Sequence, residues 1–206
     1  MARWHQRLLR KLLRTPTRAM LRFLGVYSAD RWRKFALDSD LIANPGYLPT
    51  PDYFQEYLNR NSDIHVESLE EIEQWLLTCT YARRESYAEK VWPISVEFEC
   101  RKTGDCLDHS LWAWKKLHEL GFTPLFMYGQ TRLDDSVAFV KSDQPHHWVQ
   151  FEHAGTEFLL ESTWKDQPQL AVSLYDISSY YQPWLAIDTE LRYFMFPGWI
   201  DYILDD

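Results

Sequence analysis

The residues best suited to catalysis in this sequence are a cysteine, a histidine and an acid, each placed at the start or end of a predicted element. Cys106 lies where a loop turns into a helix, His146 opens a predicted strand, and Glu161 comes near the end of the next strand. A thiol, an imidazole and a carboxylate in that order can serve as nucleophile, base and orienting acid. The chemistry they predict is acyl transfer through a covalent thioester.

The helix that follows Cys106 positions its thiol. Its apolar residues recur at spacings of three and four and define one helical face that ends before Gly121: Leu107, Leu111, Trp114, Leu117 and Leu120. Thr103 or Asp105 can cap the first turn. A thiol at this point faces free backbone N–H groups and the positive end of the helix dipole, which lower its pKa. The alternative is a buried structural cysteine, because free cysteines are among the most buried residue types.

Two strands, predicted at residues 146–151 and 156–164, carry the histidine and the acid. Neighbouring residues of a strand point to opposite faces, so His147 shares a side with Val149 and Phe151, the predicted core side. His146 shares the other side with Trp148. This alternation predicts that His146 faces the thiol and that His147 is a core or rim histidine. Both rings can face one thiol only across a bulge.

Three short motifs resemble the transglutaminase-like cysteine hydrolases, a branch of the papain-like architecture. They are Gly104-Asp105-Cys106-Leu107-Asp108, then His146-His147-Trp148-Val149, then Glu161-Ser162-Thr163. The resemblance covers about residues 66–165. It implies an α+β fold with the catalytic cysteine at a helix N-terminus packed on an antiparallel sheet. It also implies a triad of Cys106, His146 and Glu161, because the family pattern His-x-Trp selects His146.

The resemblance implies a protein or peptide substrate and leaves open proteolysis, deamidation and transamidation. The family usually has Asp where this chain has Glu161, and the extra methylene changes the reach of the carboxylate. A second hypothesis therefore stays open, a catalytically inactive binding or structural protein recruited through its basic N-terminus. Trp92 lies in a segment of the kind that often precedes the family's cysteine, and it is either a site residue or a core tryptophan.

Charge and turn-forming residues divide the chain of 206 residues into two parts. Residues 1–34 hold ten Lys or Arg and one acid, whereas the rest holds twelve basic and twenty-nine acidic residues. Residues 44–52 are rich in turn formers and predict a boundary between a basic helical extension, residues 1–43, and a catalytic domain, residues 52–206, that includes an aromatic C-terminal tail. The extension is a helix docked on the acidic body, a membrane-surface helix, a nucleic-acid arm or a partner helix. A transit peptide also remains open.

The remaining cysteines and histidines receive structural roles. Cys79 falls on the apolar face of a helix predicted at residues 68–79, and nothing near Cys100 suggests activation. His109 and His118 fit positions on the surface of the helix of Cys106. An odd number of cysteines at irregular spacing indicates a reducing compartment, so we expect a cytoplasmic protein, peripheral to a membrane if the N-terminus binds one. No metal-ligand spacing is present, and we predict neither a metal nor a cofactor.

Overall fold

The structure is a computed structural model, and it describes residues 30–37, 50–83, 95–132, 145–166 and 169–205. Within these residues the chain has an α+β fold built on a seven-stranded antiparallel sheet in the order β1-β9-β8-β4-β5-β6-β7. The strands are β1 (Phe35–Leu37), β4 (Leu125–Thr131), β5 (His146–His153), β6 (Thr156–Leu160), β7 (Ala171–Ser173), β8 (Tyr181–Ile187) and β9 (Tyr193–Met195). A short parallel pair, β2 (Thr80–Tyr81) and β3 (Thr103–Gly104), lies just before the helix of Cys106.

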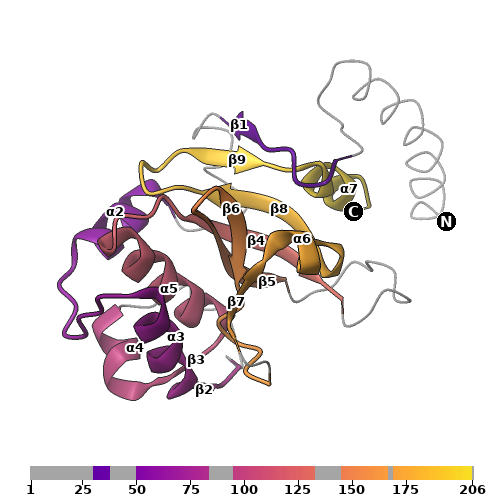
Figure 1. Ribbon diagram of the computed structural model, residues 1–206. Helices are drawn as coiled ribbons and strands as arrows, with labels where there is room; N and C mark the ends of the chain where they lie inside the picture. The colour runs from indigo at the N-terminus through magenta and orange to yellow at the C-terminus, as the bar shows by residue number, and fades with distance from the viewer. Residues whose placement is uncertain (1–29, 38–49, 84–94, 133–144, 167–168, 206) are drawn as a thin grey trace, which may run out of the picture.

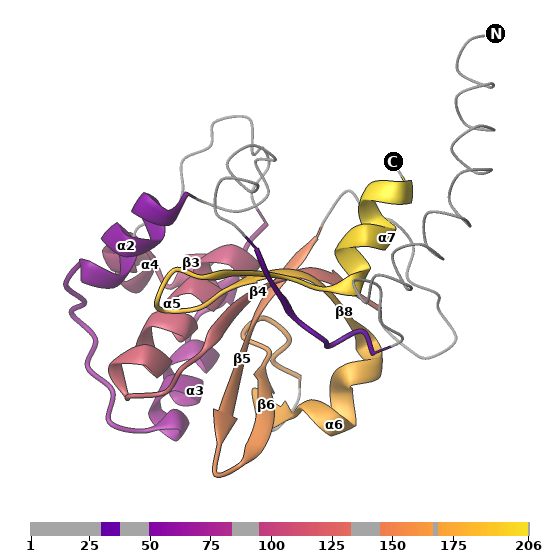
Figure 2. The same cartoon turned by 90° about the horizontal axis from the view of Figure 1, so that it is seen from above.

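Four helices, α2 to α5, gather on one side of the sheet, and α6 and α7 lie away from this group (Figures 1 and 2). The helices are α2 (Pro51–Asn59), α3 (Leu69–Leu77), α4 (Ser95–Arg101), α5 (Cys106–Glu119), α6 (Leu174–Ile177) and α7 (Pro197–Asp205). Side-chain caps fix two of their starts, because Thr50 accepts a hydrogen bond from the N–H of Tyr53 and Ser68 accepts one from the N–H of Glu71. The helix predicted from sequence at residues 68–79 is present as α3.

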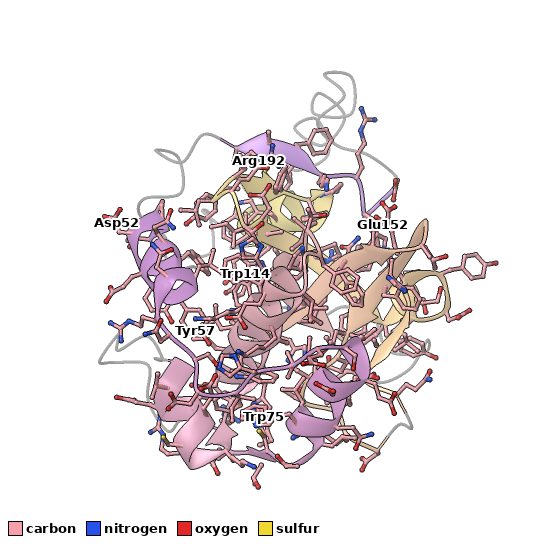
Figure 3. All side chains as sticks on the ribbon, turned by 60° about the vertical axis from the view of Figure 1, so that its left-hand side comes forward. Asp52, Tyr57, Trp75, Trp114, Glu152 and Arg192 are labelled. Carbon is pink, nitrogen blue, oxygen red and sulfur yellow. The ribbon has the colours of Figure 1, made fainter. Side chains whose placement is uncertain are left out.

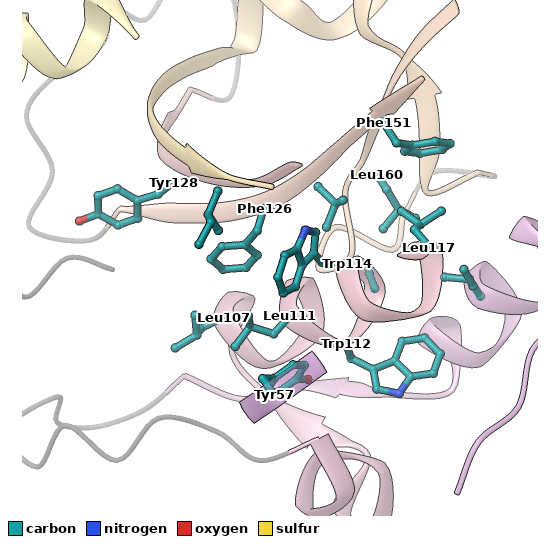
Figure 4. Packing of buried hydrophobic residues seen from close by; sticks show 14 of the residues in the cluster. Tyr57, Leu107, Leu111, Trp112, Trp114, Leu117, Phe126, Tyr128, Phe151 and Leu160 are labelled. Carbon is teal, nitrogen blue, oxygen red and sulfur yellow. The ribbon is translucent and has the colours of Figure 1, made fainter. Parts of the chain in front are cut away.

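The helix α5 is the centre of the hydrophobic core. It packs on β5 and β4 on one side and on α3 and α4 on the other. Figure 4 shows Trp114 and Leu117 of α5 directed toward the sheet, near Phe126 and Leu160, while Trp112 points away from it. Trp114 also lies in the middle of the molecule in Figure 3, whereas Glu152 lies toward its edge. A helix fixed on both sides gives its first residue a well-defined position.

The second face of α5 is buried although its sequence is polar. Lys115 and Lys116 are buried, and their ammonium groups donate to the backbone carbonyls of Tyr57 in α2 and of Arg60 and Ile64 in the segment after it. Burial without such acceptors would cost several kcal/mol for each charge, about the penalty of an unpaired ion in a protein interior. These contacts let a helix with only one apolar stripe lie inside the fold.

The C-terminal tail, which sequence alone could not place, supplies the middle of the sheet. The strand β8 pairs antiparallel with β4 on one side and with β9 on the other. The pairing of β4 with β8 shifts register between Tyr128 and Gly129. A β-carbon on Gly129 would lie 2.2 Å from the carbonyl oxygen of Gln182, so only glycine permits this close approach of the two strands.

Part of the predicted N-terminal extension belongs to the same sheet. Residues 35–37 form β1, which pairs antiparallel with β9 at the sheet edge. The predicted helices of residues 3–24 and most of the predicted boundary at residues 44–52 lie outside the described residues, so the division at that boundary stays a prediction. In the part of the chain that the structure describes, every helix is too short or too polar to cross a membrane.

Candidate active site

Cys106 is the first residue of α5, and a capping box fixes it there. Asp105 is the N-cap, and its Oδ1 accepts from the N–H groups of Leu107 at 2.9 Å and Asp108 at 3.3 Å. In return Asp108 Oδ2 accepts from the N–H of Asp105 at 3.0 Å. Gly104 makes room for this exchange, because a β-carbon there would lie 2.5 Å from the β-carbon of Asp108. The Gly-x-Cys-x-Asp pattern thus has a physical cause.

Two histidines, not one, adjoin the thiol. His147 Nδ1 lies 3.6 Å from Cys106 Sγ, and hydrogen bonding to both His146 and His147 lowers the pKa of the thiol. The prediction that His147 is merely a core or rim histidine is wrong. Strand alternation correctly placed His147 on the same side as Val149 and Phe151. The helix α5 packs on that side of β5, so Cys106, its first residue, lies beside the ring of His147.

His146 reaches the site from the outer end of the strand. It is the first residue of β5, and its ring stacks on Trp164 with centroids 5.6 Å apart and on Trp148 with centroids 6.2 Å apart. It donates its Nε2–H to Glu161 Oε2 at 2.8 Å. This arrangement turns the other ring nitrogen, Nδ1, away from the carboxylate. The structure therefore pairs His146 with Glu161 and places His147 beside the thiol, so the triad of Cys106, His146 and Glu161 stays a prediction.

Glu161 is fully buried, and donors surround its carboxylate. Beside His146, Oε2 accepts from the hydroxyl of Tyr181 at 2.8 Å. Oε1 accepts from the N–H of Thr163 at 3.0 Å and from its hydroxyl at 2.7 Å. A carboxylate that accepts this many hydrogen bonds is held in its ionised form. Tyr181 comes from β8, so the tail that fills the sheet also helps to fix the acid.

The pKa values of the cluster favour an ion pair. Burial alone raises the pKa of Cys106, but the hydrogen bonds and charges of His146 and His147 lower it from 9.0 to about 6. Burial alone lowers the pKa of His146, but the charge of Glu161 and hydrogen bonds with Cys106 and Glu161 raise it from 6.5 to about 10. Burial raises the pKa of Glu161, and the charge and hydrogen bonds of its partners more than offset this and lower it. Near neutral pH the cluster holds a thiolate, an imidazolium and a carboxylate.

Two solved structures are similar to the chain. One is Legionella pneumophila LapG, with 14% sequence identity over 73% of this chain and 84% of that chain and a TM-score of 0.46. The other is a Cytophaga hutchinsonii protein named as a candidate cysteine protease, with 10% identity over 78% of this chain and 64% of that chain and a TM-score of 0.36. No protein-family model and no curated protein matches the sequence. The predicted α+β fold, with Cys106 at a helix N-terminus packed on an antiparallel sheet, is confirmed by the geometry described above.

Aromatic side chains border the cluster. Tyr81 of β2 is half-exposed and close enough to Cys106 for the thiolate charge to raise its pKa, after the larger effect of burial. Its strand pairs with β3 directly before the cysteine. Trp164, also partly exposed, covers the ring of His146. Sequence reasoning assigned no role to Tyr81, Trp164 or Tyr181, since a lone aromatic residue carries no motif. Trp92 lies outside the described residues.

The other candidate residues have structural environments. His109 is buried, not at the helix surface as predicted, and its Nδ1 donates to the carbonyl of Asp105 at 2.8 Å. Burial lowers its pKa to about 4, so it stays neutral. Cys79 is buried in the core, and burial raises its pKa to about 11. Cys100 is exposed, and all three cysteines are free thiols. The pKa of Cys106 is lowered, whereas that of Cys79 is raised.

Proposed function

We propose that the chain is a cysteine-dependent acyl-transfer enzyme that acts on amide bonds through a thioester, with Cys106 as nucleophile, His146 as base and Glu161 as the acid that orients the base. The observation that supports it most is a chain of polar side chains at a helix start: the thiol 3.6 Å from His147 Nδ1, the neighbouring His146 in the same strand, and a buried carboxylate that bonds to His146. A structural cysteine needs no such chain, and the buried Cys79 has none.

His146 is the better base of the two histidines because Glu161 bonds to it and not to His147. The carboxylate accepts the Nε2–H of His146, which leaves Nδ1 for the thiol and stabilises the imidazolium. The imidazolium then gives a proton to the leaving amine when the tetrahedral intermediate collapses. Water or a second amine attacks the thioester next, which gives hydrolysis or transamidation.

The oxyanion of the tetrahedral intermediate finds a donor at the start of α5. The carboxylate of Asp105 caps the N–H groups of Leu107 and Asp108, and the N–H of Cys106 directly precedes them at the helix start. This N–H lies at the positive end of the helix dipole, beside the reacting sulfur. The capping box thus holds the nucleophile and directs a donor at the charge that forms next to it.

Glu161 in place of the family's usual Asp does not separate the acid from the base, since their hydrogen bond is 2.8 Å long. The hypothesis of an inactive binding protein loses the argument that rested on this difference. Substrate class stays within peptides and proteins, as the resemblance implies, and the half-exposed Tyr81 and Trp164 supply apolar surfaces on which such a chain can lie.

An electrophilic probe tests the proposal. The full chain is treated with a fluorescent vinyl sulfone or acyloxymethyl ketone at pH 7, and the labelled residue is identified by mass spectrometry. We expect labelling of Cys106, its loss in Cys106→Ala, and its retention in Cys100→Ala, a matched control at an exposed thiol. Equal and slow labelling of Cys106 and Cys100 would contradict the proposal. A library of fluorogenic peptide amides and a fluorescent primary amine then separates hydrolysis from transamidation.

A further inference from the structure

The second imidazole beside the thiol has no place in a three-residue mechanism. His147 Nδ1 lies 3.6 Å from the sulfur, as close as a hydrogen bond to sulfur allows, yet no acid adjoins this ring. The other nitrogen of the ring, Nε2, is buried and has no hydrogen-bond partner in the described residues. A triad base is oriented by an acid at its second nitrogen, and His147 lacks that orienting partner among the described residues.

The surroundings of His147 hold its ring in place. It stacks on Phe126 with centroids 5.3 Å apart and an interplanar angle of 23°, and Tyr128 lies with its centroid at 5.0 Å. Its backbone carbonyl accepts from the hydroxyl of Ser110 at 2.9 Å, and that hydroxyl lies 3.1 Å from the hydroxyl of Ser162, next to the catalytic acid. The strand β4 and the helix α5 therefore fix the ring against the sulfur.

The unpartnered ring nitrogen indicates which side of His147 serves the site. Nε2 is buried without a partner among the described residues, whereas Nδ1 lies 3.6 Å from the sulfur. A buried N–H without an acceptor is costly. The tautomer with its proton on Nδ1 avoids this cost at Nε2 and directs an N–H at the sulfur.

We infer that His147 is a positioning residue that holds the Cys106 thiolate through a hydrogen bond from Nδ1, while His146 carries the proton that moves in the reaction. This inference rests on the proposed function, since it divides two tasks within that site. One ring positions the nucleophile, and the other acts as base and acid. The groups that face the sulfur are His146 and His147 from β5, Tyr81 from β2 and, through His146, Glu161.

Two substitutions of His147 separate this role from that of a base and from a packing role. His147→Asn keeps a neutral N–H donor near the position of Nδ1 and cannot carry a proton. His147→Leu keeps an apolar side chain but no donor. The rate of alkylation of Cys106 by iodoacetamide is measured from pH 4 to 10 in the full chain, by mass spectrometry of the Cys106 peptide, and melting temperatures are recorded beside it.

We expect His147→Leu to move the acid limb of the alkylation profile upward by about one pH unit, which is about 1.4 kcal/mol of hydrogen bonding to the thiolate. His147→Asn should recover most of that shift. Turnover of a peptide amide, found as described above, should persist in His147→Asn and fall by several orders of magnitude in His146→Asn.

Each other outcome contradicts the inference in a distinct way. An acid limb unmoved in His147→Leu, with a lower melting temperature, would mean that the ring only fills space. Loss of turnover in His147→Asn with turnover kept in His146→Asn would make His147 the base. A wild-type Cys106 that titrates near an ordinary cysteine pKa of about 8.5 would instead overturn the proposed function itself.

Discussion

Replacing Glu161 with Gln tests the ion pair in the most direct way, because it changes the charge of the side chain and hardly its size. The carboxylate accepts from His146 and Tyr181 through Oε2 and twice from Thr163 through Oε1. A Gln side chain carries one acceptor oxygen and one NH₂ group. Whichever way the amide turns, its NH₂ faces a donor, and a buried N–H of His146 or Thr163 loses its acceptor.

The expected effect on stability follows from burial. Glu161 is 0% exposed, so solvent does not screen its pairing with His146. Removing one partner of a buried ion pair costs about 3–5 kcal/mol in free energy of unfolding. The folded pKa of Glu161 lies below its usual 4.5, so its contribution is present above pH 4.5 and is lost as pH falls through the folded value. The raised pKa of His146 contributes stability below pH 6.5, and this is lost as pH rises toward about 10.

The stability difference between wild type and Glu161→Gln is therefore greatest between about pH 4.5 and 6.5, the ordinary pKa values of the two groups. Turnover should fall by about 10⁴-fold, the scale seen when an amide replaces the acid of a triad. The upper limb of the pH profile should move from about 10 toward 6.5, because His146 loses the charge that raises its pKa. The pKa of His146 that sets this limb should stay above 6.5, because the Cys106 thiolate beside the ring still raises it.

The assay compares Glu161→Gln with Glu157→Gln, which makes the same change at an exposed carboxylate on β6 that accepts from Gln150 at 3.3 Å. Urea unfolding at pH 5.5 and 9.5 gives the stability difference, and alkylation of Cys106 across pH gives the state of the thiol. If both variants matched wild type in stability and in the alkylation profile, Glu161 would not be the partner of His146. The division of roles proposed for the site would then fail.

Three further expectations concern the same site. Iodoacetamide should modify Cys106 with a midpoint near pH 6, whereas Cys79, with a pKa of about 11, should stay almost unmodified below pH 9 in the folded chain; equal rates would contradict this. The methyl group of Gly104→Ala would displace Asp108 from the capping box. This variant should therefore raise the pH midpoint for alkylation of Cys106 and lower the free energy of unfolding by about 1 kcal/mol, the usual loss for a helix cap. The alkylation profile measures the first effect and urea unfolding the second. Glu161→Asp introduces the family's usual residue and shortens the side chain by about 1.5 Å, more than the hydrogen bond to His146 tolerates. This variant should therefore lower turnover, and a turnover equal to that of wild type would refute the expectation.

Much of the site was predictable because the sequence signals for it are local. The period of apolar residues after Cys106 and the capping Asp105 place the thiol at a helix start, and the structure begins α5 at that residue. Alternation along β5 assigned His147 correctly to the core side. Both signals depend on a few neighbouring residues, which is the range over which propensity and patterning decide local structure.

What sequence did not predict depends on contacts between distant segments. Nothing in residues 146–151 says which end of α5 lies over the core side of the strand, so the contact of His147 with the thiol could not be foreseen. The burial of His109 arises in the same way, from α4 and β2 packing over the polar side of α5, where Phe98 and Tyr81 face its ring. Tyr181, which bonds to Glu161, lies twenty residues after the acid in the sequence and belongs to β8.

The place of β8 in the sheet has a consequence for synthesis of the protein. Cys106, His146 and Glu161 all leave the ribosome before residues 181–187, which pair with β4 and supply the hydroxyl that fixes the acid. Until β8 is made, β4 lacks one of its two neighbours and the acid lacks one of its four hydrogen bonds. We therefore expect the thiol of the nascent chain to react weakly while it is surrounded by other unfolded polypeptide. Nucleophilic reactivity should arise only after β8 has joined the sheet.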